Sequence, residues 1–539
     1  MKCSLKPPNR GRRFRNRWLT AGASVLIIAG AAGCSAGSAG SAGTSATTSG
    51  SSSDTLTISV SNPPLSLDPA EAPNNADSTI YADLAYEPLI ILSPTGALTP
   101  GLATSWKYAD SSKKVFDLTL RSGVKFSNGQ PLTAAAVVAS INWQKKADGP
   151  EAVYVDNVAS AQATGPLTVQ LNLVQANPVI AFLLTQRFVF GEIIAPAGSA
   201  SPKTLGTTTL GAGEYMLDAS QTVPNSQYVY VPNPNYYDKG AVHFKKITVK
   251  VIENAETALS AVQSGQVAYA DGAYATAAAA KQDGVAVYSA LEGFYGVFLL
   301  DRDGTLVPAL KSQLVRQALN YATDRAGIVS ALFGAYGQPN DEVSIPGYQD
   351  EGFVPSYANY YSYDPAKAKQ LLTQAGYPNG FTMTIGAVSS CGNGIELAQA
   401  LASDWAKVGV TVNVKTYSDI NAIVSPWEGK QLPAAMCNYD AQPMFIEAGQ
   451  LLAANAGIFN IFGNSNPALN ALIAKAYAAS DQGSAAVANA WAAVEREVVT
   501  LGWEIPVATG ADIYFANKSL EGVQVSPTSF VPDPVLWHY

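Results

Sequence analysis

The sequence predicts a large α/β protein built from at least two lobes. Capped helical segments and short strands of alternating apolar residues follow one another along most of the chain. The segment from residue 54 to residue 539 is about twice the length at which a single hydrophobic core stops growing. No apolar run after residue 33 is long enough to span a bilayer. We therefore expect helices and strands to share more than one core.

The first third of the chain is expected to contain strands and one well-capped helix. Residues 55–60 alternate as a strand, and residues 78–86 have a helical pattern. Residues 115–126 alternate on either side of a Ser-Gly turn, which is typical of a β-hairpin. Thr133 is suited to cap an alanine- and valine-rich helix that extends to Trp143.

The middle of the chain predicts a strand-helix-strand unit. A strand pair is expected within residues 211–237, and a further strand at residues 247–252. Residues 256–264 are expected to form a short helix that Gly265 ends, with the next strand at residues 267–270.

Further helices alternate with strands in the second half. Residues 310–323 place their apolar side chains on one helical face, and Asp324 is expected to cap a second helix that ends at Gly334. The clearest helix is expected at residues 365–375, because Asp364 supplies the N-cap oxygen and a proline takes the first helical position. A strand, a helix and a strand are expected next, at residues 382–386, 395–407 and 410–414.

The N-terminal segment has the pattern of an export signal. Five arginines precede an uncharged apolar stretch at residues 18–32, which is short for a membrane-spanning helix and typical of a signal-peptide core. Ala31-Ala32-Gly33-Cys34 resembles the bacterial lipoprotein box, although Ala31 stands where that box usually has leucine. We expect residues 1–33 to be a signal peptide and Cys34 to carry a lipid. A secreted protein and an uncleaved anchor are the alternatives.

The acidic charge of the residues after the leader argues against two kinds of partner. Residues 35–53 contain only Ser, Ala, Gly and Thr, and such a tether has a span of roughly 25 Å. The leader holds seven of the 33 basic residues and no acid, which leaves 26 basic against 41 acidic residues in the rest. This acidic balance argues against nucleic acid as a partner and offers no polybasic patch for lipid headgroups.

The cysteines and histidines are few. Cys391 and Cys437 remain after the leader and the anchor, so one disulfide is expected, with two buried free thiols as the alternative. His243 and His538 are the only histidines, and neither lies near a cysteine in sequence. No metal site and no cofactor are therefore expected.

Several segments then occur in a recognisable order. They include Leu98-Thr99-Pro100-Gly101-Leu102-Ala103, Leu120-Arg121-Ser122-Gly123-Val124-Lys125-Phe126, Gly211-Ala212-Gly213-Glu214-Tyr215, Gln263-Ser264-Gly265-Gln266-Val267 and Val315-Arg316-Gln317-Ala318-Leu319-Asn320-Tyr321. Together they resemble the bacterial family 5 extracellular solute-binding proteins, which are the peptide-binding components of ABC importers. Ala135 and Ala136 stand where that family usually has an acidic pair.

The resemblance implies a two-lobed periplasmic-binding-protein-like fold of type II, in the peptide-binding class, with an extra subdomain in lobe I. Two segments are expected to cross between the lobes, near residues 288–293 and 502–507. The implied division is lobe I at residues 54–290 with an inserted subdomain at about 90–210, lobe II at 291–504, and a return to lobe I at 505–539.

The resemblance also implies a binding function without catalysis. Such a protein is a monomer that holds a small ligand, most simply a di- or oligopeptide, between its lobes and delivers it to a membrane permease driven by ATPase subunits. A peptide brings charged ends whose enclosure costs several kcal/mol unless each finds a partner. In the family an Asp beside an aromatic, shortly before a Pro, clamps the amine. The matching segment holds Asn438, Tyr439 and Asp440, and we expect Asp440 to meet the cationic end, with a solvated loop acid or a helix cap as the alternative.

Other candidates for ligand contact have ordinary structural alternatives. Tyr439 and Trp427 could pack on ligand side chains, although aromatic residues in lobe cores are commoner. Asn74 and Asn75 lie in a loop that borders ligand in relatives, and loop polarity alone would explain them. Lys430 could meet a ligand carboxylate or be a solvated surface residue.

Rival functions fit the sequence less well. A Ser-His-Asp hydrolase would have to use His243 or His538, and no GxSxG, HExxH or GxxxxGK[ST] motif is present. We therefore expect no enzymatic activity. Nickel chelates, haem, sugar oligomers and opines remain alternative ligands, since the family binds them all, and a surface adhesin or signalling receptor is a third interpretation.

Overall fold

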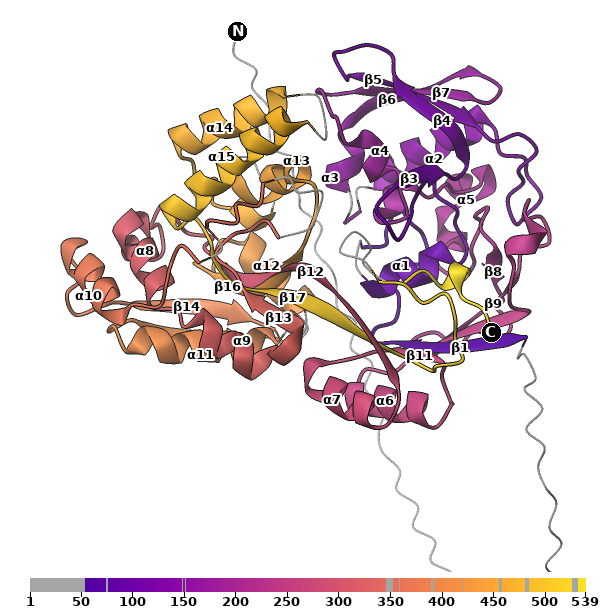
Figure 1. The fold of residues 1–539 in the computed structure, drawn as a ribbon. Helices are drawn as coiled ribbons and strands as arrows, with labels where there is room; N and C mark the ends of the chain where they lie inside the picture. Colours follow the sequence, from indigo (N-terminus) through magenta and orange to yellow (C-terminus); the bar gives the residue numbers. More distant parts are fainter. Residues whose placement is uncertain are drawn as a thin grey trace, which may run out of the picture. The chain divides into compact units, whose positions relative to one another are not determined.

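The main sheet of this computed structural model is mixed and runs through most of the described chain (Figure 1). Its strands lie in the order β15 (Thr411–Thr416), β14 (Thr382–Ala387), β16 (Ala435–Asp440), β12 (Ala286–Phe298), β17 (Ile505–Ala516), β11 (Tyr269–Asp271), β1 (Thr55–Val60), β10 (Lys246–Val251), β9 (Gln227–Pro232) and β8 (Tyr215–Leu217). β13 (Gly337–Pro339) also pairs with β17.

The structure describes residues 54–539 except 74–75, 148, 151, 346–351, 358, 389–390, 392, 419, 455–457, 480–483 and 526–531. Within this part, no helix is both long enough and apolar enough to cross a membrane.

Strands β12 and β17 form the longest pairing of the sheet. They run antiparallel from Ala286↔Ala516 to Val297↔Ile505, with register shifts near Glu292 and after Tyr295. On one side β17 continues the sheet through β11 to β1, which pairs in parallel with β10. On the other side β12 pairs antiparallel with β16, and β16, β14 and β15 are parallel. Two strands thus join all others of this sheet.

A second sheet is inserted between β1 and β8 in sequence. Its strands lie in the order β4 (Ala103–Tyr108), β5 (Val115–Leu120), β7 (Thr168–Leu173) and β6 (Val158–Gly165), beside the hairpin of β2 (Ile90–Leu92) and β3 (Leu98–Pro100). Helices α2 (Ala134–Ala147), α3 (Ala152–Val155), α4 (Ile180–Leu183) and α5 (Pro196–Ala200) accompany it. Buried Phe116, Leu118, Val137 and Ile141 belong to the core between sheet and helix α2.

The remaining helices flank the main sheet. They are α1 (Ala76–Asp83), α6 (Ala255–Gln263), α7 (Tyr274–Gln282), α8 (Gln313–Tyr321), α9 (Arg325–Leu332), α10 (Pro365–Gln374), α11 (Gly394–Ala406), α12 (Ile420–Glu428), α13 (Met444–Glu447), α14 (Pro467–Ala478) and α15 (Ala485–Leu501). Short 3-10 turns and one π-helical turn (Ala448–Leu452) connect several of them. This is the mixed α/β architecture that the sequence predicted.

The predicted caps are present where short polar side chains precede a helix. Asp364 accepts a hydrogen bond from the Lys367 backbone N–H at 2.8 Å, and Asp324 accepts one from Gly327 at 3.0 Å. Helix α10 is followed by Gly376 with φ +89°, a left-handed conformation that ends the helix at little steric cost.

Two predicted elements differ from the structure. The expected helix at residues 310–323 is divided, because Ser312 is extended (ψ 122°) between a 3-10 turn (Pro308–Lys311) and α8. Strand β5 does not fold back on residues 121–126 as a hairpin. It pairs instead with β4 and β7, which the local turn signal could not specify.

The buried ion pair between Arg302 and Glu504 yields a stability prediction. Both side chains are almost fully buried, and Glu504 also accepts a hydrogen bond from the Leu299 N–H at 2.7 Å. Replacing Glu504→Gln leaves the guanidinium charge buried without its counter-charge, so we expect the free energy of unfolding to fall by about 3–5 kcal/mol. Urea denaturation at pH 8 measures this.

The matched control is Lys245→Gln, which breaks the exposed ion pair of Lys245 with Asp54. Solvent screens that pair, so its urea midpoint is expected to stay unchanged. Equal midpoints for the two variants would contradict the assigned importance of the buried pair.

Candidate functional site

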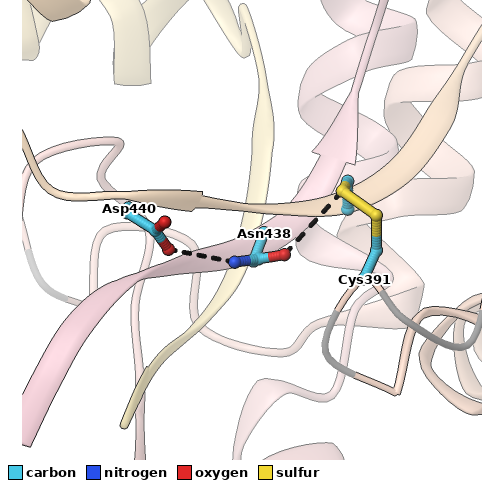
Figure 2. The surroundings of a disulfide bond; sticks show 4 residues. Cys391, Asn438 and Asp440 are labelled. Atoms are coloured by element: carbon cyan, nitrogen blue, oxygen red, sulfur yellow. Dashed lines mark hydrogen bonds between the residues drawn. A yellow bond between two sulfur atoms is a disulfide. The ribbon is translucent and has the colours of Figure 1, made fainter. Parts of the chain in front are cut away.

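The end of strand β16 carries the predicted site segment. Asp440 is the last residue of the strand and is partly exposed, and its Oδ1 accepts a hydrogen bond from Asn438 Nδ2 at 3.0 Å (Figure 2). Since side chains two apart on a strand share a face, Asn438 lies beside Asp440 and holds one of its oxygens. Asp440 sits opposite Gly293 of β12, in the centre of the main sheet.

Burial and, after it, the nearby Asp512 carboxyl raise the pKa of Asp440 to about 7, against the lowering effects of Arg187 and the Asn438 hydrogen bond. A carboxylate in this position is poorly solvated and lacks a full counter-charge. It is therefore suited to take a cation from outside the protein.

Glu292 lies in the register shift of β12, between Leu291 and Gly293. An extra residue in a strand pair re-aims a side chain, and here the Glu292 carboxyl meets that of Asp512 on β17. Glu292 is 2 % exposed, and neither of its oxygens accepts a hydrogen bond from a protein donor. Its one hydrogen bond is therefore the one it donates to Asp512 when protonated. Burial, Asp512 and Asp440 all raise the pKa of Glu292.

Asp512 lies next to this bulge and is partly exposed. The hydroxyls of Tyr295 and Tyr514 each donate to one of its oxygens at 3.4 Å. These donors and the Glu292 proton lower the pKa of Asp512, but burial outweighs them and the net direction is upward.

A second carboxyl pair lies at the next strands of the same sheet. Asp271 is the last residue of β11 and sits opposite Tyr514, two residues from Asp512 on β17. Its carboxyl shares a hydrogen bond with Asp77 of α1, and it accepts from the Ser61 N–H at 2.8 Å. Asn62 Nδ2 donates to Asp77 at 2.6 Å. Burial is the largest cause of the raised pKa of Asp77 and of Asp271.

Arg187 is a cation that acts on the carboxyl groups of Glu292 and Asp440. It comes from the inserted segment after α4 and is 3 % exposed, and its Nη2 donates to the Ala441 carbonyl oxygen at 2.6 Å. Tyr154, also in the inserted segment, donates to Gln442 at 3.3 Å. The two residues that follow Asp440 are thus held by the inserted segment.

The structure joins Cys391 and Cys437 through a disulfide, with their Cα atoms 4.7 Å apart (Figure 2). Cys437 lies on β16, three residues before Asp440, so the bridge fixes the strand that carries the site to the segment before α11. Asn438 Oδ1 lies 3.8 Å from Cys437 Sγ. A bridged sulfur has no proton to donate, so this contact is van der Waals.

The aromatic candidates lie in the core. Tyr439 is 5 % exposed on the strand face opposite to Asp440, its ring packs edge-on against Phe459, and its hydroxyl hydrogen-bonds Gln450. Trp427 of α12 is 3 % exposed and packs on Phe298. Contact of either ring with ligand stays a prediction.

The remaining predicted residues are not brought to Asp440 by any described contact. Lys430 is exposed after α12, with its ammonium group 5.7 Å from the Phe462 ring centre. Asn74, Asn75 and Cys34 lie outside the described residues. Their roles stay predictions.

The sequence reasoning missed Glu292, Asp512, Asp271, Asp77 and Arg187. A signal was present for two of them, because Glu292 and Asp512 are single acids within long apolar stretches. Such an acid is costly to bury unless it has a specific role. The bulge that turns Glu292 toward Asp512 could not be read from the pattern.

In the described part of the chain, neither a metal-ligand cluster nor a histidine contact accompanies Asp440. No three histidine, cysteine, aspartate or glutamate side chains in the described residues converge as metal ligands would. The rings of His243 and His538 lie 5.5 Å apart and both side chains are largely exposed, and neither contacts the carboxyl groups around Asp440 in any described interaction.

Residues 97–454 match the family described as bacterial extracellular solute-binding proteins, family 5. The chain belongs to this family. Family 5 members are solute-binding components of ABC importers, so the two-lobed fold class and the binding role expected from the sequence are confirmed.

Relatives extend this finding. The chain is 27 % identical over 376 residues to the glutathione-binding protein GsiB of Salmonella paratyphi A, covering 68 % of this chain and 69 % of GsiB. Its fold is similar to the dipeptide-binding protein of Pseudoalteromonas sp. SM9913 solved with Met-Leu (TM-score 0.77, 20 % identity, 90 % and 99 % coverage). It is also similar to the Escherichia coli murein tripeptide binding protein MppA (TM-score 0.77, 22 % identity, 90 % and 98 % coverage).

The raised pKa of Asp440 predicts a pH dependence of stability. The native state keeps the proton up to about pH 7, whereas the unfolded chain loses it near the ordinary value of 3.8. The native state therefore binds more protons across this window, and the free energy of unfolding falls as the pH rises through it. We expect Asp440→Asn, which cannot titrate, to make this fall shallower in urea denaturation from pH 5 to pH 8.

The control for this experiment is Asp218→Asn. Asp218 lies on an exposed turn, and hydrogen bonds from Ser220 and Gln221 lower its pKa. Its titration lies below the window, so its slope should equal that of the wild type. A slope for Asp440→Asn identical to both would refute the assigned protonation.

The disulfide yields a further prediction. Cys391 and Cys437 are 46 residues apart, and a bridge across such a loop stabilises a protein by about 2–4 kcal/mol. The double variant Cys391→Ser/Cys437→Ser should lose this amount in urea denaturation. Adding reductant to the wild type should produce the same loss and leave the double variant unchanged, and a reductant effect on the variant would contradict the assignment.

Proposed function

We propose that this family 5 protein captures a peptide through its α-amine and delivers it unaltered to an ABC permease. The observation that carries the proposal is Asp440, a poorly solvated carboxyl at the end of a central strand with Asn438 on one oxygen. A peptide ammonium group would give this carboxyl the counter-charge that it lacks. The names of GsiB, MppA and the dipeptide-binding protein support a peptide-like ligand.

The lobe boundaries implied by the family fall within β12 and at the start of β17. We place lobe I at residues 54–290, with its inserted subdomain at about 90–210, lobe II at 291–504 and the return at 505–539. Ligand would favour a closed arrangement, since only that arrangement contacts it from both sides. The hydrogen bond of Arg187 to Ala441 supports a role for the subdomain in closure.

We place the protein outside the cytoplasm, held at the membrane by a lipid on Cys34 and a tether at residues 35–53. The leader of residues 1–33 and the small residues before Cys34 support this placement. The protein would act as a monomer with permease and ATPase partners. It would perform no catalysis, since the sequence carries no GxSxG, HExxH or GxxxxGK[ST] motif.

Other solutes remain possible outcomes of a binding test. An opine or another amine shares the ammonium group that Asp440 would hold. A nickel chelate is less favoured, because no metal-ligand cluster occurs in the described part of the chain.

Calorimetry with trialanine and N-acetyl-trialanine tests the proposal. We expect trialanine to bind and the acetylated peptide, which has no positive amine, to bind much more weakly. Asp440→Asn should weaken trialanine binding by about 2 kcal/mol, or roughly thirtyfold, since it removes one charge of a buried pair. Asp218→Asn, on the exposed turn, is the control.

Two results would refute parts of this function. Equal affinity for the free and the acetylated peptide would remove the amine clamp. Hydrolysis of the peptide during incubation, detected by mass spectrometry, would remove the role of a binding protein without catalysis.

A further inference from the structure

The carboxyl groups around Asp440 exceed what one ammonium group requires. Five acids belong to one electrostatic cluster, namely Asp77, Asp271, Glu292, Asp440 and Asp512. Arg187 is a cation that acts on Glu292 and Asp440, and its guanidinium also donates to the Ala441 carbonyl oxygen. A single α-amine at Asp440 would leave the other four acids to share protons among themselves.

The register of the sheet places these acids in a row. Asp440 and Gly510 both sit opposite Gly293, and Asp512 is two residues beyond Gly510 on β17. Asp271 pairs with Tyr514, the next residue of β17 on the same face. Because strands are about 4.8 Å apart, the row crosses the centre of the sheet from β16 to β11.

Glu292 points to a ligand independently of the count of acids. It is 2 % exposed, and no protein N–H or O–H group donates to either of its oxygens. A buried carboxyl with no donor is costly. The strand bulge directs it to Asp512, which is partly exposed, so an external cation at Asp512 would also reach Glu292.

We propose that the ligand carries a second cationic group, and that Glu292 and Asp512, extended by Asp271 and Asp77, receive it while Asp440 holds the α-amine. The preferred ligand class is thus a peptide with a lysine-like side chain, or a related diamine. This inference rests on the proposed function and specifies its substrate.

The hydrogen bonds within the carboxyl pairs are consistent with such a ligand. The Glu292 carboxyl hydrogen-bonds that of Asp512, and the Asp271 carboxyl hydrogen-bonds that of Asp77, and such a bond between two carboxyl groups requires a proton in each pair. A bound ammonium group can take the place of the shared proton, which leaves to solvent, while the net charge of the pair stays the same. A neutral ligand side chain could not.

The test compares tripeptides by calorimetry with the full-length protein. Trialanine is substituted at each position in turn by lysine or by norleucine, which has a similar chain without the charge. At one position at least, lysine should bind at least about tenfold more tightly than norleucine. The tripeptide position at which lysine is preferred identifies the ligand side chain that reaches Glu292 and Asp512.

The variant Glu292→Gln/Asp271→Asn then assigns the preference to the cluster. The amides resemble protonated carboxyl groups in shape and hydrogen bonding, so the fold should be kept. The ratio of lysine-peptide affinity to norleucine-peptide affinity should fall to about one in this variant. Glu87→Gln is the matched control, because Glu87 is also buried with its pKa raised to about 8 but accepts from Tyr237, outside this cluster.

The outcomes separate this inference from the function on which it rests. If lysine and norleucine peptides bind equally well at every position, the second cationic group is refuted and peptide capture stands. If the preference persists in Glu292→Gln/Asp271→Asn, the cluster is not its cause. If no peptide of either series binds, both proposals fall.

Discussion

The antiparallel pairing of β12 with β17 is the interaction on which the rest of the structure depends. Every other strand of the main sheet reaches its place through one of these two. The strands that carry the acids, β16 and β11, are attached directly to them. The spacing of the carboxyl groups is therefore set by backbone hydrogen bonds and not by flexible loops, which is the condition for a preformed binding site.

The site shows how acidic side chains are accommodated within a packed β-sheet. A bulge at Glu292 breaks the regular alternation, and it directs an acid from an apolar strand toward Asp512. Glycines at positions 293 and 510 let neighbouring backbone and the Tyr295 ring come close, since a Cβ at either place would clash at under 2.5 Å. Local backbone irregularity and small residues thus create a polar centre within a packed sheet.

Local signals predicted much of the fold and less of the site. The caps at Asp324 and Asp364 follow from side-chain chemistry within one turn, so sequence alone identified those helices. The resemblance identified the family, and the role of the Asp440 segment stays a prediction. The proximity of Glu292 and Asp512 could not be predicted, because it depends on the register between two strands more than 200 residues apart in sequence. No local sequence pattern encodes that register. Arg187 could not be predicted because its hydrogen-bond partner, the Ala441 carbonyl oxygen, lies 254 residues away in sequence.

The bridge between Cys391 and Cys437 ties oxidation to the order of folding. Helix α11, strand β15 and helix α12 lie between the two cysteines in sequence, and β16 must pair with β12 and β14 to take its place. The assembled unit holds the two sulfur atoms at bonding distance. A chain kept in a reducing compartment retains two thiols there, so their modification by an alkylating reagent reports whether maturation has been completed.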